Sequence, residues 1–137
     1  MIKTPAFSAT LGRLLMSALF LSSGFGKLAN PAGTKAYIAA NGLPWPDLAY
    51  GVAIAIEVGF SVALVFGYRT RAVAAVMAIF TLVTGLAFHN NLSDSHQVIN
   101  LLKNIAIVGG FLQVIVLGAG ALSLDAFLAS RRPPAQP

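Results

Sequence analysis

Apolar residues dominate four separate stretches of the chain, and short polar connections separate them. The apolar stretches cover residues 10–28, 48–67, 72–89 and 98–122. Because an α-helix rises about 1.5 Å per residue, about 20 residues cross the roughly 30 Å hydrocarbon core of a bilayer. The pattern therefore predicts an all-α fold, an integral membrane four-helix bundle.

The connection between the first two spans carries helix signals of its own. Asn30 is a suitable N-cap, Pro31 suits a first helical position, and Asn41-Gly42 ends the segment. Tyr37 and Trp45 are residues that favour the membrane–water interface. We expect a short interfacial helix here.

Composition narrows the class of protein. Of the 137 residues, 57% are hydrophobic and only 9% are charged, which is unusual for a soluble domain. We therefore expect a single transmembrane domain over residues 1–137 in a lipid bilayer, with a disordered polar tail over 123–137. The chain has no cysteine, which excludes disulfides and thiolate metal sites within it.

The net charge of +5 comes from basic residues that stand singly or in pairs beside the apolar stretches. This distribution argues for membrane topology rather than for a nucleic-acid partner. With both termini in the cytoplasm, the positive-inside rule is satisfied, so we expect an N-in and C-in orientation. Arg13 and Lys27, near the two ends of the first span, are expected to extend to the two membrane surfaces.

The second predicted span carries one acid, Glu57, near its middle. A carboxyl group at this depth must be hidden from lipid or face a wet cavity. On the opposite side of the helix, small residues recur at every fourth position, which would let another helix pack closely, in the same chain or in a homo-oligomer. This column consists of Gly51, Ala55, Gly59, Ala63 and Gly67.

Polar residues from all four predicted spans are expected at the outer half of the membrane. They are Glu57, Lys103, Asn104, His89 and Lys27. One interpretation is a pocket in which a quinone-like molecule docks and Glu57 handles a proton. The other is a structural ion pair between Glu57 and Lys103. The spacing of the two histidines, with no acid at ligand distance, predicts no metal site.

Five segments follow one another in a recognisable order. They are GRLLMSALFLSSGFGKL from Gly12, YIAANGLP from Tyr37, EVGFSVALVFGYRTR from Glu57, HNN from His89 and LLKNIAIVGG from Leu101. Together they resemble the DoxX family of small bacterial inner-membrane proteins over roughly residues 11–122. Carried over by position, the family-like polar sites are Arg13, Lys27, Glu57, Arg71, His89, Lys103 and Asn104.

The resemblance implies a membrane subunit or anchor of a quinone-linked redox or detoxification system, with a soluble or membrane oxidoreductase as its partner. Catalysis by this chain alone is not expected, because it has no cysteine and no recognisable cofactor motif. Two other classes stay open. One is a small-solute or proton-coupled transporter or channel that uses Glu57, and the other is a membrane scaffold or assembly factor.

Overall fold

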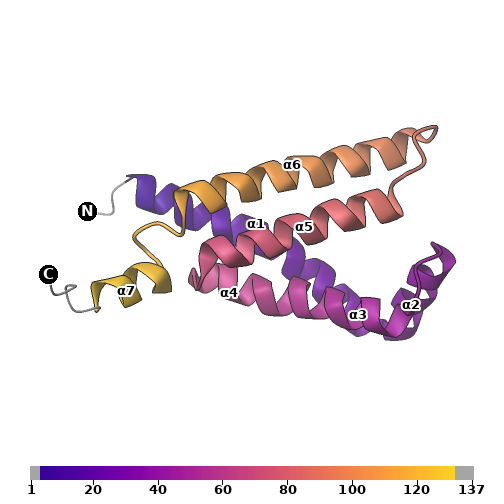
Figure 1. Cartoon of the computed structure of the whole chain (residues 1–137), viewed down its shortest axis with the longest axis horizontal. Coiled ribbons are helices and arrows are strands. Elements are labelled where there is room, and N and C mark those ends of the chain that lie inside the picture. The colour runs from indigo at the N-terminus through magenta and orange to yellow at the C-terminus, as the bar shows by residue number, and fades with distance from the viewer. Residues whose placement is uncertain (1–3, 132–137) are drawn as a thin grey trace, which may run out of the picture.

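The computed structural model describes residues 4–131, and every regular element in that range is a helix (Figure 1). The elements are α1 (Thr4–Ala29), α2 (Pro31–Ala40), α3 (Pro46–Ile54), the π-helix η1 (Ala55–Phe60), α4 (Ser61–Phe66), α5 (Thr70–Phe88), α6 (Ser95–Leu117) and α7 (Leu124–Ser130). Four segments are long and apolar enough to cross a membrane: Ala6–Ala29, Pro46–Phe66, Thr70–Phe88 and Ser95–Leu117. The predicted all-α class with four spans is confirmed.

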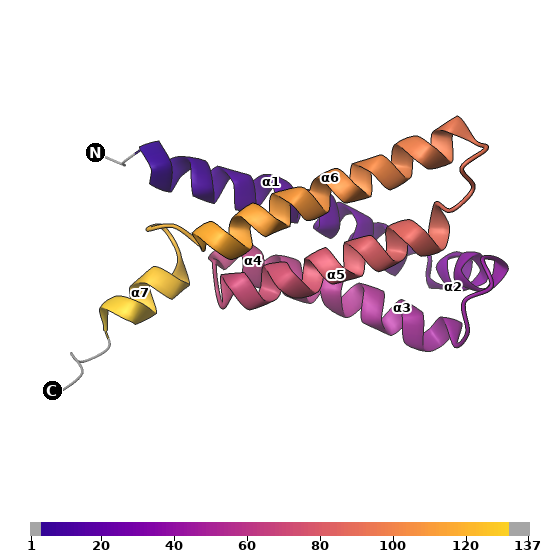
Figure 2. The ribbon, with the colours of Figure 1, turned by 45° about the horizontal axis from the view of Figure 1, so that its top comes forward.

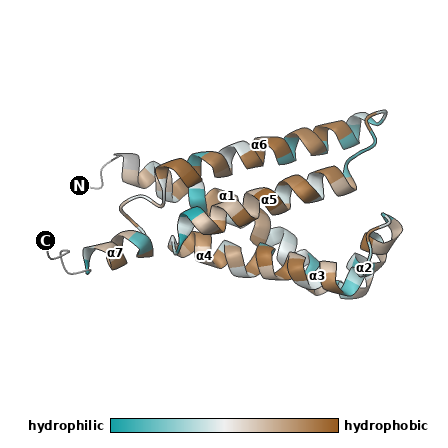
Figure 3. Cartoon of the chain, in the orientation of Figure 1, coloured by the Kyte–Doolittle hydropathy of each residue, from teal (hydrophilic) through white to brown (hydrophobic). Residues whose placement is uncertain are grey.

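Two pairs of long segments make up the bundle. α5 and α6 lie side by side along most of their length, and α1 packs against η1 and α4 (Figures 1 and 2). The core forms where the pairs meet, around Phe20, Leu64, Met77 and Phe111, with the rings of Phe20 and Phe111 5.6 Å apart. Most remaining large apolar side chains on the long helices are exposed, where lipid would cover them. Figure 3 shows that these helices are mainly hydrophobic.

The two ends of the bundle differ. One end, called here the α2 end, carries α2 and the connection between α5 and α6, whereas the α7 end carries α7 and the turn between α4 and α5 (Figure 1). The predicted short helix in the first connection is present as α2. Asn30 caps it by accepting a hydrogen bond of 3.0 Å from the Gly33 N–H. The ring of Tyr37 stacks on Phe88, which holds α2 against the end of α5.

The fourth span and the tail differ from the prediction. α6 ends at Leu117, five residues before the predicted end, because Gly118 adopts a φ of +78° and leaves the helix. Residues 124–130, predicted to be disordered, form α7, which begins where the Ser123 hydroxyl accepts a hydrogen bond from the Ala126 N–H. Residues 132–137 of the predicted tail lie outside the described residues.

The predicted column of small residues is interrupted by η1. A π-helix contains more residues per turn than an α-helix, so the four-residue repeat loses its alignment across it. Gly51, Ala55 and Gly59 face outward, but Ala63 packs against the core and Gly67 is buried. Gly67 ends α4 with a φ of +67°, a conformation that favours glycine. The prediction of one continuous packing column was therefore wrong.

Candidate functional site

A cavity of about 460 Å³ lies at the α2 end, between α1, α2, α3, η1, α5 and α6. Its walls are mainly apolar and include Phe20, Ile38, Phe80 and Phe88. Polar side chains interrupt this apolar lining, among them Ser23, Lys27, Glu57, Thr84, His89 and Asn104. An apolar cavity with a few polar groups is the usual form of a small-molecule site, and ligand sites measure about 300–1,000 Å³.

Glu57 and Lys27 form an ion pair at this cavity. Lys27 Nζ lies 2.9 and 2.8 Å from the two carboxylate oxygens of Glu57 and also donates to Ser23 Oγ at 2.7 Å. The Glu57 side chain is 7% exposed and that of Lys27 is 28% exposed. The acid predicted from the sequence is thus hidden from lipid, and its carboxylate is compensated by a cation and hydrogen bonds.

Close approach of α1 to η1 makes this pair possible. Gly24 lies one turn before Lys27, and a methyl group in its place would come within 2.7 Å of Val58 Cγ2 and 3.1 Å of Glu57 Cβ. Only a residue without a side chain allows the two backbones to approach this closely. Gly24 therefore allows α1 to place Lys27 next to the π-helix η1, which contains Glu57.

The predicted pairing of Glu57 with Lys103 was wrong. Lys103 is exposed on α6 and does not line the cavity, whereas its neighbour Asn104 does. Successive residues of an α-helix point about 100° apart, so the rotation of α6 that turns Asn104 inward turns Lys103 outward. Asn104 lies so close to Gly85 of α5 that a methyl group there would be 2.8 Å from Asn104 Nδ2.

His89 ends α5 at the rim of the cavity. Its Nδ1 lies 2.9 Å from Oε1 of Gln97, near the start of α6. Since an amide oxygen only accepts, Nδ1 carries the proton of this hydrogen bond, and Nε2 remains for another partner. Gln97 was not identified from the sequence, and its place in the polar stretch that follows His89 was the available signal.

Arg13 lies at the α7 end and is 1% exposed, so the prediction that it extends to the membrane surface was wrong. Its guanidinium donates to the carbonyls of Leu64 at 2.9 Å, Val65 at 3.0 Å and Leu122 at 2.7 Å. Carbonyls near a helix C-terminus lack partners within the helix, and a cation there is favourable. Arg13 therefore ties α1 to the end of α4 and to the segment after α6.

Arg71 connects two other helices at the same end. Its Nη2 donates to the carbonyl of Val116, near the end of α6, at 3.3 Å. Neither Arg13 nor Arg71 lines the cavity at the α2 end. Among residues 4–131, no three His, Asp or Glu side chains gather as they would around a metal ion.

Asp125 of α7 was not identified from the sequence. Its carboxylate accepts hydrogen bonds from the N–H groups of Arg69 at 2.7 Å and Thr70 at 2.8 Å, and so caps α5. Burial of the carboxylate opposes ionisation, but hydrogen bonds from Thr70 and Arg69 and the charge of Arg13 outweigh it and lower the pKa of Asp125. The Ser123-Leu124-Asp125 sequence, typical of a helix start, was the available signal.

We expect Asp125→Asn to lower the free energy of unfolding by about 1 kcal/mol at neutral pH, because a charge-assisted cap becomes a neutral one. In the native protein this contribution is present above the ordinary pKa of 3.8 and is lost as the pH falls through the lower folded pKa. Unfolding in detergent micelles, followed by circular dichroism from neutral to acidic pH, measures both effects.

Asp47→Asn is the control for this prediction, because the Asp47 side chain is 84% exposed and forms an ion pair with the partly exposed Lys35. Asp47→Asn is expected to leave the free energy of unfolding at neutral pH unchanged. Equal stability of the native protein and Asp125→Asn at every pH would contradict the prediction.

The fold and the cavity define a class: a small multi-pass membrane protein with a mainly apolar cavity between its helices that contains a few polar side chains. The family model named DoxX matches residues 8–90, which is more than half of the chain. The protein belongs to the DoxX family, as its sequence pattern predicted.

Two relatives from Escherichia coli (strain K12) match nearly the whole chain. Inner membrane protein YqjF is 38% identical over 118 residues, which are 86% of this chain and 89% of the relative. Inner membrane protein YphA is 33% identical over 120 residues, which are 84% of this chain and 86% of the relative. No solved structure matches the chain.

Proposed function

We propose that this protein is a membrane subunit or anchor of a quinone-linked redox or detoxification system, and that a quinone-like molecule binds in the cavity at the α2 end. The observation that carries the proposal is the cavity itself, with its mainly apolar wall and its polar groups from α1, η1, α5 and α6. Membership in the DoxX family supports a site within the membrane. The proposed orientation is N-in and C-in, which puts the α2 end on the outer side.

Two side chains suit the carbonyl oxygens of a quinone ring. The Asn104 amide makes no hydrogen bond within the described residues, so its N–H groups are available to a ligand. His89 uses Nδ1 for Gln97, and Nε2 is available when it carries a proton. The aromatic rings of Phe20, Phe80 and Phe88 offer apolar surface to the ring and the tail of the ligand.

In this proposal the ion pair supplies the proton path. Reduction of a quinone to a quinol consumes electrons and an equal number of protons. An oxidoreductase partner with its own cofactor supplies the electrons. Glu57 passes protons from the cavity rim to the quinone oxygens, and Lys27 holds its carboxylate in place at 2.8 Å.

Ala87→Phe should weaken quinone binding, because Ala87 lines the cavity and a phenyl ring would fill part of it. The measurement is the binding of ubiquinone-1, a short-tailed quinone, to the purified protein in nanodiscs by native mass spectrometry. We expect the affinity to fall by more than about tenfold. Ala106→Phe, the same change at an exposed position of α6 that does not line the cavity, should bind normally.

Equal binding by both variants, or no saturable binding by the native protein, would overturn the quinone proposal.

Co-purification in mild detergent tests whether the protein has an oxidoreductase partner. A stoichiometric oxidoreductase supports the subunit proposal. A solute flux in liposomes that depends on a pH gradient and needs no partner would instead show that the protein is a transporter. The same preparation gives the oligomeric state, and hence tests whether a second copy packs on the exposed Gly51, Ala55 and Gly59 face.

A further inference from the structure

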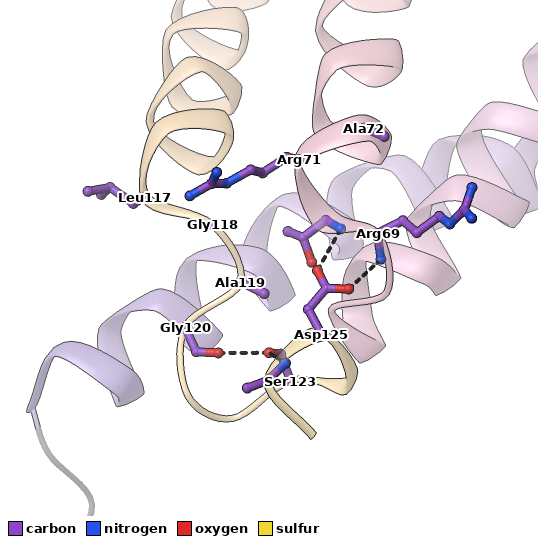
Figure 4. A pocket seen from close by; sticks show the side chains of 11 residues that line it. Arg69, Arg71, Ala72, Leu117, Gly118, Ala119, Gly120, Ser123 and Asp125 are labelled. Atoms are coloured by element: carbon purple, nitrogen blue, oxygen red, sulfur yellow. Dashed lines mark hydrogen bonds between the residues drawn. The ribbon is translucent and has the colours of Figure 1, made fainter. Parts of the chain in front are cut away.

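A second hollow lies at the α7 end (Figure 4), and none of its lining residues lines the first cavity. It measures about 630 Å³ and is formed by the start of α5, the end of α6 and the segment that leads into α7. Arg71 extends across it toward the backbone at Gly118, as Figure 4 shows. The proposed function makes no use of this hollow.

The guanidinium of Arg71 has free hydrogen-bonding capacity. An arginine carries five N–H donors, and Arg71 uses one of them, for a long hydrogen bond of 3.3 Å to the Val116 carbonyl. Arg69 also lines the hollow, but Figure 4 shows its side chain directed away from Arg71. The positive charge of Arg71 thus stands at the hollow without a matched anion within the described residues.

Asp125, the acid of this hollow, does not neutralise Arg71. Its two carboxylate oxygens are directed at the N–H groups of Arg69 and Thr70, at 2.7 and 2.8 Å (Figure 4). These two N–H groups at the start of α5 are therefore already bonded to the carboxylate of Asp125. An anion that enters the hollow would bind the Arg71 side chain and not the helix terminus.

Part of the remaining lining is apolar and continues onto the membrane-facing surface. Ala72 and Ala119 line the hollow, and Leu117, also in the lining, is 74% exposed. Because α5 begins and α6 ends here, the hollow lies at the boundary between the spans and the water phase. An anionic headgroup with an attached acyl chain matches this combination of a cation beside exposed apolar surface.

We propose that this hollow binds a phosphate group through Arg71, and that the phosphate belongs to an anionic phospholipid of the adjacent leaflet. The planar guanidinium of Arg71 is suited to two parallel hydrogen bonds to phosphate oxygens. The acyl chains would lie along Leu117.

Native mass spectrometry of the full chain released from nanodiscs tests this proposal. With equal phosphatidylglycerol and phosphatidylcholine, the native protein should retain phosphatidylglycerol preferentially. Arg71→Gln should reduce that retention by about fivefold, as expected for one arginine near a membrane surface. Arg71→Lys, which keeps the charge but not the two-pronged geometry, should give an intermediate value. The melting temperature of each variant shows that it is folded.

Arg131→Gln is the matched control, because Arg131 is an exposed arginine at the same end that stacks on Phe127 and does not line the hollow. It should retain phosphatidylglycerol like the native protein. Equal retention of both lipids, or an equal loss in the Arg71 and Arg131 variants, would overturn the proposal. Displacement of the lipid by inorganic phosphate in an Arg71-dependent way would support the phosphate site but identify a soluble phosphate compound as its ligand.

Discussion

Arg13→Ala is expected to lower the free energy of unfolding by about 4 kcal/mol, the largest effect of any single substitution considered for this protein. Its guanidinium is 1% exposed and binds the carbonyls of Leu64, Val65 and Leu122. In a membrane protein, water does not replace these donors within the bundle. The variant would leave three carbonyls without their charged donor and an empty volume beside Gly67.

Equilibrium unfolding in mixed detergent micelles measures this loss. Arg13→Lys should be intermediate, because an ammonium keeps the charge but cannot span all three carbonyls. Arg131→Ala removes an exposed arginine from the same end and is expected to change the stability little. Similar stabilities of Arg13→Ala and Arg131→Ala would show that the buried hydrogen bonds do not stabilise the fold.

Lys27→Met is expected to cost about 3 kcal/mol, because it leaves the carboxylate of Glu57 buried without its cation. Glu57→Gln should cost less, since it removes the buried negative charge. The double variant should then be more stable than the sum of the two single losses predicts, with a coupling energy of about 2 kcal/mol. Equilibrium unfolding of the native protein, the two single variants and the double variant gives this coupling energy.

The chain offers a second Lys-acid pair as a control for this cycle. Lys35 and Asp47 also form a salt bridge, but the Asp47 side chain is 84% exposed. The corresponding cycle with Lys35→Met and Asp47→Asn should show no measurable coupling, because water and salt screen an exposed pair. Equal coupling in the two cycles would contradict the importance of burial at Glu57.

Hydropathy was sufficient to predict the four spans, because the length and apolarity that a bilayer requires are local properties of the sequence. The burial of Glu57 followed from the same argument. The partner of Glu57 did not follow, because Lys27 and Lys103 were both expected in the outer half of the membrane and the choice between them depends on helix rotation. Gly24 determines that choice through the close approach of α1, which is a tertiary contact.

The α7 end was harder to predict because its interactions join residues far apart in the chain. Arg13 binds Leu122 across 109 residues, and Asp125 caps α5 across 55 residues. An apolar stretch that contains one arginine is equally compatible with a side chain that reaches the membrane surface and with one that is buried. Only the folded arrangement of α1, α4 and α7 distinguishes the two.

The hydrogen bonds of Arg13 also bear on the order in which the protein is made. Arg13 is synthesised before all three of its carbonyl partners, and Leu64 and Val65 are synthesised before Leu122. During insertion, Arg13 can therefore bind the end of α4 before the fourth span is made. Its hydrogen bond of 2.7 Å to Leu122 forms only after α6 and the segment that follows it have been synthesised.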